Sequence, residues 1–168
     1  MNRPTPAKRP KPQVSSGNAP AAAGETFTVP LKLWVVLARA YGAVSRQVEA
    51  DVAQHDLTAM EFGILEVLHH KGPLLLGEIQ RKVLVTSGGI TYLVDRLVEK
   101  GLVKREACPE DRRARYAVLT PAGDKLIRRI FPDHARMIGR ALSGLTAKEQ
   151  VEATKLLRRL GLAAAEKE

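Results

Sequence analysis

The 168-residue sequence has little cysteine, few aromatic side chains and no long apolar run. Its single cysteine, Cys108, cannot form an internal disulfide or supply a thiolate cluster, which excludes a disulfide-stabilised secreted domain and a cysteine-rich zinc module. No apolar run approaches the roughly 20 residues of a membrane span, because Arg39 interrupts the stretch from Leu33 to Val44. We therefore expect a soluble protein without a membrane partner, in a reducing cytoplasm.

Acidic residues are outnumbered: 18 Asp and Glu stand against 27 Lys and Arg, which gives a formal net charge of +9. This excess indicates a polyanionic partner, and nucleic acid is a better candidate than a membrane surface. Half of the 10 prolines fall within the first twenty residues, among basic residues and without an acid. Residues 1–27 are therefore expected to form a disordered basic arm, which either adds phosphate contacts or only aids solubility.

The sequence also lacks the arrangements that enzymes use. No cysteine or acidic cluster stands at metal-ligand spacing from the 4 histidines, and the adjacent His69 and His70 point to different faces of a helix. There is no glycine-rich phosphate loop, nucleophile elbow or paired-carboxylate motif. We expect a protein that is not an enzyme and that has no catalytic residue, cofactor or metal.

Helical periodicity dominates both ends of the chain. Residues 121–168 contain two amphipathic helices, the second of which begins with a capping box at Thr146. The apolar stripes of these two helices and of an N-terminal helix offer more apolar surface than a small domain covers by itself. This favours dimerisation helices at 28–56 and 121–168. The alternative is that they fold back on their own subunit. The N-terminal stripe consists of Trp34, Leu37, Tyr41, Val44 and Val48.

The central residues 57–120 predict a winged helix-turn-helix domain. A capping box at Thr58 opens one helix, and a short helix follows over 77–83. After a tight turn, Thr86 is placed to cap a further helix, which ends at Gly101.

The periodicity then changes to that of strands. Residues 102–108 and 114–120 predict a β-hairpin with a charged tip at 109–113. The expected fold is mainly α with a small β-hairpin wing, flanked by N-terminal and C-terminal dimerisation helices.

This order of elements suits double-stranded DNA. A helix fits the major groove and binds phosphate through the N–H groups of its first turn, and arginines on a hairpin enter a narrow minor groove. Alternatively, Tyr92 packs over the wing and the arginine-rich tip is a solvated turn. The predicted DNA-contacting residues are Thr86, Ser87, Gly88, Thr91, Tyr92 and Arg96 on the helix, and Arg112, Arg113 and Arg115 on the hairpin.

Five motifs occur in order between residues 30 and 162. They are Leu57-Thr-Ala-Met-Glu-Phe62, Leu93-Val-Asp-Arg-Leu97, Glu99-Lys-Gly-Leu-Val103, Asp111-Arg-Arg113 and Leu119-Thr-Pro-Ala-Gly123. This succession resembles the MarR family of bacterial transcriptional regulators. The resemblance implies a homodimer that represses by occupying a palindromic operator and that is released by a small aromatic or phenolic ligand or by an oxidant.

The resemblance also implies roles for single residues. Asp111 would brace the wing, and Arg113 would enter the minor groove. Where the family usually has Ser-Arg-Ser-Thr at the start of its recognition helix, this sequence has Thr86-Ser-Gly-Gly89. The two glycines remove side-chain contacts to bases, so the resemblance implies no particular operator sequence.

The ligand pocket of the family would draw here on an apolar lining with imidazoles, which suits a small aromatic acid or phenol. Several of these residues stand equally well at the spacing of core residues. The five candidates are Trp34, Tyr41, His55, Phe62 and His69.

Two further functions stay open. Cys108 lies close in sequence to Lys104 and Arg105, cations that lower a thiol pKa, so it is either an oxidant sensor or an inert strand-end thiol. A winged module that serves protein assembly, or that binds DNA without sequence preference, is the alternative to a specific regulator, and Gly88 and Gly89 favour it.

Overall fold

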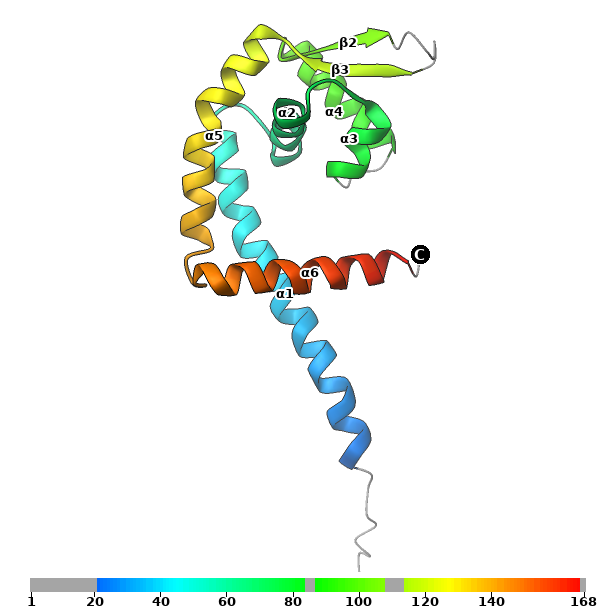
Figure 1. The fold of residues 1–168 in the computed structure, drawn as a ribbon, viewed down its shortest axis with the longest axis vertical. Helices are drawn as coiled ribbons and strands as arrows, with labels where there is room; N and C mark the ends of the chain where they lie inside the picture. The colour runs from blue at the N-terminus through cyan, green and yellow to red at the C-terminus, as the bar shows by residue number, and fades with distance from the viewer. Residues whose placement is uncertain (1–20, 84–86, 108–113, 167–168) are drawn as a thin grey trace, which may run out of the picture. The chain divides into compact units, whose positions relative to one another are not determined.

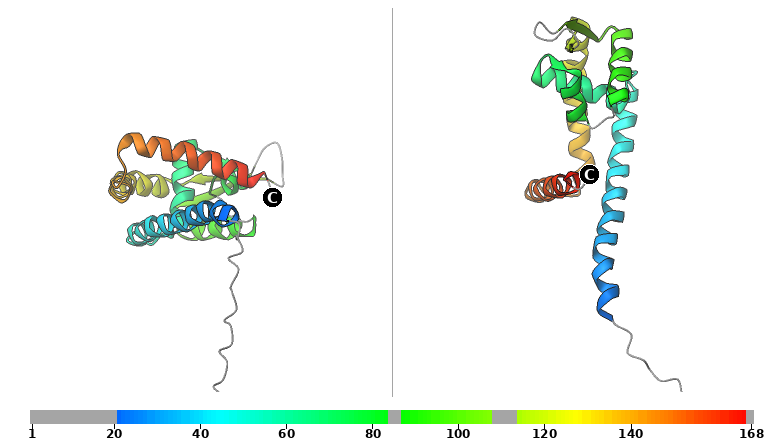
Figure 2. Two further views of the ribbon diagram at one scale, coloured as in Figure 1. Left: turned by 90° about the horizontal axis from the view of Figure 1, so that it is seen from below. Right: turned by 90° about the vertical axis from the view of Figure 1, so that its right-hand side faces the viewer.

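The structure is a computed structural model, and it describes residues 21–83, 87–107 and 114–166 of the chain. The chain divides into two units, one ending at Arg39 and the other beginning at Ala40. In the larger unit, α2, α3, α4 and the sheet gather at one end of α5, while α6 leaves its other end (Figure 1). Two further views show the same grouping (Figure 2).

The described elements are helical except for one small sheet. The three strands are antiparallel in the order β1-β3-β2, with Val103 of β2 opposite Leu119 of β3 and Leu74 of β1 opposite Ala117. This confirms a mainly α fold with a hairpin wing. The helices are α1 (Ala21–Ala53), α2 (Ala59–Lys71), α3 (Leu76–Val83), α4 (Ser87–Glu99), α5 (Pro121–Ala141) and α6 (Ala147–Ala165), and the strands are β1 (Leu74–Leu75), β2 (Val103–Ala107) and β3 (Arg115–Leu119).

One boundary and one strand differ from the sequence-based expectation. Helix α1 begins at Ala21, within the range 1–27 that was expected to be an arm, and it contains Pro30. A run of alanine, the best helix former, follows Pro20 directly and explains the early start. Strand β1 was not predicted, because two residues are too few to show a period.

The helix starts that the sequence predicts at three threonines are confirmed. The Thr58 hydroxyl accepts a hydrogen bond from the Glu61 backbone N–H at 3.2 Å, and Thr120 accepts one from Gly123 at 3.0 Å. At Thr146 a second capping box forms with Glu149, and hydrogen bonds from the Thr146 side chain and backbone lower the pKa of that glutamate. Local sequence therefore determines where α2, α5 and α6 begin.

The core lies between the end of α1, α2, α3, α4, the sheet and the first half of α5. Each of these elements contributes one apolar face, at the spacing that the sequence indicates. The largest fully buried apolar side chains are Ile64, Leu65, Leu68, Ile79, Leu97, Ile127, Val52, Val94 and Val103.

Helix α6, in contrast, has no buried residue within the subunit. Five of its apolar side chains are exposed: Val151, Leu156, Leu157, Leu160 and Leu162. Over the residues with described structure, no helix is both long enough and apolar enough to cross a bilayer.

One charged residue, Glu61, is fully buried, with 0 % of its surface exposed. Its Oε2 accepts hydrogen bonds from the Thr58 N–H at 2.8 Å and from Lys100 Nζ at 3.1 Å, and its Oε1 accepts one from Arg96 Nε at 3.1 Å. Burial by itself raises the pKa of this carboxyl, but the bonds from Thr58, Lys100 and Arg96 together outweigh burial and lower it. The carboxylate thus links the start of α2 to the last turn of α4 and the residue after it.

Replacing Glu61 by Gln should lower the free energy of unfolding by about 3 kcal/mol at neutral pH, because two cations lose the charge that they bind. The folded-state pKa lies below the ordinary glutamate value of about 4.3. The stabilisation is therefore complete above that value and is lost as the pH falls through the folded-state pKa. Urea unfolding should show a difference between wild type and E61Q that shrinks in acid.

The exposed Glu152, which pairs with Lys155 on α6, provides the control variant Glu152→Gln. A small effect there is expected at every pH. Wild-type stability in E61Q would show that the carboxylate does not hold α2 and α4 together.

Candidate nucleic-acid interface

Helix α4 presents a polar face to solvent. Its apolar residues Ile90, Val94 and Leu97 are buried, whereas Thr91 is exposed and Tyr92 has 60 % of its surface exposed. Tyr92 therefore does not pack into a core under the wing. Of the other residues predicted on this helix, Thr86 lies outside the described residues. At positions 87 and 88 the structure describes the helical backbone only.

Arg96 has a role in the fold that sequence analysis did not reveal. Its guanidinium is half-buried and bonds to Glu61. A hydrogen bond with the Tyr92 side chain, followed by the bond to the Glu61 carboxylate, raises the pKa of Arg96. The arginine therefore joins an exposed residue of α4 to the buried carboxylate of α2.

The wing is tied to α4 by an ion pair. Arg105 on β2 places its Nη2 2.9 Å from Asp95 Oδ1 and donates a hydrogen bond to the Thr91 carbonyl at 3.3 Å. Strand β2 runs alongside β3, whose first residue, Arg115, is exposed and donates to the Ala114 carbonyl at 2.9 Å. This geometry holds the base of the wing beside the exposed face of α4.

The wing tip itself is not described. The predicted residues Asp111, Arg112 and Arg113, together with Cys108, lie outside the described residues. Their roles stay predictions.

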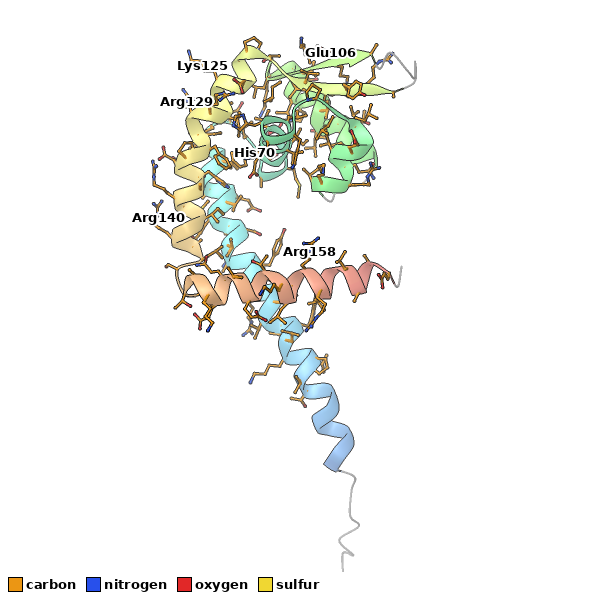
Figure 3. The ribbon with its side chains drawn as sticks, in the orientation of Figure 1. His70, Glu106, Lys125, Arg129, Arg140 and Arg158 are labelled. Carbon is orange, nitrogen blue, oxygen red and sulfur yellow. The ribbon has the colours of Figure 1, made fainter. Side chains whose placement is uncertain are left out.

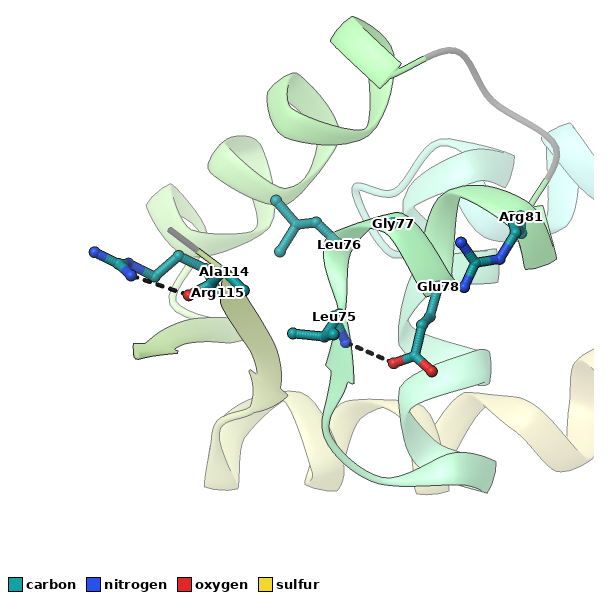
Figure 4. A pocket seen from close by; sticks show the side chains of 7 residues that line it. All are labelled: Leu75, Leu76, Gly77, Glu78, Arg81, Ala114 and Arg115. Atoms are coloured by element: carbon teal, nitrogen blue, oxygen red, sulfur yellow. Dashed lines mark hydrogen bonds between the residues drawn. The ribbon is translucent and has the colours of Figure 1, made fainter. Parts of the chain in front are cut away.

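A pocket of about 320 Å³ opens between α3 and β3 (Figure 4). Leu75, Leu76 and Gly77 line it, and Arg81 and Arg115 lie on either side. The Glu78 carboxylate accepts the Leu75 N–H at 3.0 Å and caps the start of α3. Sequence analysis missed Arg81, although the basic last turn of a helix that precedes a recognition helix was a usable signal.

The five residues predicted to form an effector pocket are differently placed. Phe62 is a core residue, 3 % exposed, that packs on His134 with ring centroids 4.3 Å apart. His69 Nδ1 lies 3.4 Å from Asp124 Oδ1, and Tyr41 is 70 % exposed. His55 is half-buried, and the exposed Trp34 belongs to the unit that ends at Arg39.

An apolar pocket of about 420 Å³ does lie between the end of α1 and the start of α2. None of the five predicted residues lines it; its lining consists of Glu49, Ala53, Leu57, Thr58, Ala59 and Met60. No group of three or more His, Cys, Asp or Glu within the described ranges is arranged to hold a metal ion.

A short helix, a second helix with an exposed polar face, and an antiparallel wing tied to that helix define a winged helix-turn-helix protein. The family model of the MarR family matches residues 55–114. The regulator MhqR of Bacillus subtilis is 43 % identical over 132 residues, which cover 79 % of this chain and 91 % of MhqR. The chain belongs to the MarR family of DNA-binding transcriptional regulators.

Solved structures agree with this fold. Sco3205 of Streptomyces coelicolor, a MarR family regulator solved in complex with DNA, has a TM-score of 0.74 and 23 % identity, covering 87 % of this chain and 91 % of that one. The DNA binding of BpsR of Bordetella bronchiseptica is regulated by 6-hydroxynicotinic acid. Its structure has a TM-score of 0.70 and 25 % identity, and the match covers 75 % of this chain and 90 % of the BpsR chain.

Arg105→Ala should leave the free energy of unfolding within about 1 kcal/mol of wild type, because the ion pair lies at the surface. Amide hydrogen exchange in β2 should nevertheless become faster, since the strand loses its side-chain link to α4. Lys104→Ala is the matched control, because Lys104 pairs with Glu106 within the same strand. Equal protection of β2 in Arg105→Ala and wild type would show that sheet pairing alone holds the wing.

Proposed function

We propose that this protein is a homodimeric repressor that binds a palindromic DNA operator and is released by a small aromatic or phenolic ligand. One observation carries the DNA-binding part: α4 exposes Thr91 and Tyr92 beside a wing that Arg105 ties to it. The net charge of +9 suits a polyanion. The fold is shared with Sco3205, which was solved in complex with DNA, and this supports the DNA-binding part of the proposal.

In this proposal, Thr91, Tyr92 and Ser87 read base edges in the major groove. Gly88 contacts DNA through its backbone, and Thr86 lies at the start of the same helix. Arg96 holds the Tyr92 side chain through their hydrogen bond. Wing arginines 112, 113 and 115 enter the minor groove, with Asp111 bracing the tip.

Arg81 adds a contact that the pocket beside α3 suggests. It is exposed at the rim of that pocket, opposite Arg115, and its guanidinium suits backbone phosphate. A phosphate contact there would set the register of α4 in the groove without reading sequence.

The dimer would cover apolar surface that one subunit leaves open. Helix α6 buries none of its residues, and Leu142 and Leu145 at the α5–α6 junction are exposed as well. Contiguous apolar surface of this kind is covered in stable proteins, and a second copy covers it with matching surface. Leu37 on α1 and Ile138 on α5 are the half-buried positions that we place in this interface.

An aromatic effector is supported by BpsR, whose DNA binding responds to 6-hydroxynicotinic acid. Residues 34, 41, 55, 62 and 69 stay the candidates for its pocket. Because Phe62 packs against the buried His134, a ligand that displaced this ring would disturb the contact of α2 with α5.

The second candidate, DNA binding without sequence preference, is favoured by Gly88 and Gly89 in the first turn of α4. Fluorescence anisotropy with a duplex from the upstream region of the gene and a scrambled duplex separates the two. A specific regulator should bind its own duplex on the order of 10³-fold more tightly. Equal affinities that both collapse with salt would favour the nonspecific binder, and no binding would favour the assembly module.

Arg113→Ala should weaken binding to every duplex by about 1–3 kcal/mol while leaving the protein folded. Arg81→Ala should weaken binding to both duplexes by the same factor. It should also reduce the slope of log affinity against log salt concentration by about 1. Arg136, which pairs with Asp133 on α5, provides the control variant Arg136→Ala. Affinities that stay at the wild-type value in Arg113→Ala would remove the wing from the interface.

Placing a charge at Leu37 or Ile138 should yield monomers or aggregates, because a carboxylate cannot be buried unpaired in an apolar interface. Sedimentation equilibrium gives the mass. The exposed Arg140 lies on the same helix as Ile138, so Arg140→Glu is the control and should stay dimeric. A well-folded Ile138→Glu variant of dimer mass would place the interface elsewhere.

A further inference from the structure

A further cleft, of about 340 Å³, lies where α5 begins. Leu102 and Leu126 are half-buried in it beside Ala122, and Lys125 and Arg129 stand at its edge, one helical turn apart. Figure 3 shows Lys125 and Arg129 on the outer side of α5, facing away from α2, α3 and α4. The cleft shares no residue with the candidate nucleic-acid interface or with the five predicted effector residues.

The two cations at this cleft have no acidic partner within the described part of the chain. Neither Lys125 nor Arg129 makes an ion pair with any described residue. The neighbouring Asp124 is already bound by Arg128 at 2.8 Å and by His69 at 3.4 Å. Arg128, more than its other neighbours, lowers the pKa of Asp124, so the carboxylate is ionised but engaged elsewhere. The cleft therefore combines an apolar floor with positive charge that no described acidic residue pairs.

We infer that this cleft binds a small organic carboxylate with an apolar body. The leucine floor packs against the apolar body, and the guanidinium of Arg129 donates paired N–H hydrogen bonds to the carboxylate, with Lys125 as a second positive charge. Inorganic phosphate would leave the floor uncovered, and a neutral aromatic would leave both cations unpaired. The volume is within the range of small-molecule sites.

The floor of the cleft is also a structural joint. The Leu102 N–H donates to the Leu97 carbonyl of α4 at 2.9 Å, and the Leu102 carbonyl accepts from the Thr120 N–H at 3.0 Å. Gly123 lies so close that a Cβ there would overlap the Leu102 carbonyl oxygen. A ligand against Leu102 therefore contacts the point where α4, β2 and α5 meet. The binding of a carboxylate at Leu102 does not require that the protein act as a ligand-released repressor.

The test is a ¹H–¹⁵N NMR titration of the full chain with benzoate, with acetate and benzyl alcohol as matched probes. Benzoate should shift the amides of Leu102, Ala122 and Leu126 in a saturable way. Acetate, which lacks the apolar body, and benzyl alcohol, which lacks the charge, should bind at least about tenfold more weakly.

Arg129→Gln should raise the Kd for benzoate about tenfold. Arg140→Gln, another exposed arginine of α5 away from the cleft, should leave the Kd unchanged. Both residues are exposed, so both variants should retain the wild-type spectrum without benzoate.

An unchanged Kd in Arg129→Gln, or equal binding of benzyl alcohol, would overturn the inference. Benzoate shifts confined to the surroundings of Tyr41, His55 and Phe62 would overturn it too, while supporting the effector pocket of the proposed function. Saturable shifts at Leu102 that Arg129→Gln abolishes would establish the site even if the protein failed to bind any duplex.

Discussion

The buried carboxylate of Glu61 is the interaction on which the placement of the recognition helix depends. It caps α2 through Thr58 and binds Arg96 and Lys100 at the end of α4. A buried charge is tolerated only when each oxygen is satisfied, and here both are. Because the bond to Arg96 has a directed geometry, the network sets the position of α4 against α2 more narrowly than apolar packing does.

From that anchored helix the rest of the interface follows by short links. Asp95 and Arg105 connect α4 to the wing, and Leu102 connects α4 to α5 through backbone bonds to Leu97 and Thr120. Helix α4, the wing and the start of α5 are therefore connected to one another by direct hydrogen bonds and an ion pair. In the proposals made above, a ligand at Leu102 or at the contact of Phe62 with His134 would act on these links and so alter how the exposed face of α4 meets DNA.

Aromatic residues at the same helical spacing differ in their burial. Trp34, Tyr41 and Phe62 all stand at helical core spacing, yet Phe62 is buried while the other two are exposed. Periodicity identifies the apolar face of a helix, but it does not say whether another part of the subunit covers that face. Arg96 shows the same limit for charge, since its buried partner lies 35 residues earlier in the chain.

The sequence alone determined what depends on neighbouring residues: the capped helix starts at Thr58, Thr120 and Thr146, the change of period at the hairpin, and the family motifs. These signals act over a few residues, where backbone hydrogen bonds and side-chain spacing are local. Tertiary structure decided the burial of Glu61, the pairing of Asp95 with Arg105, and the two clefts edged by arginines. Each of these joins residues from different elements, and only packing decides which distant side chains meet and which are left without a partner.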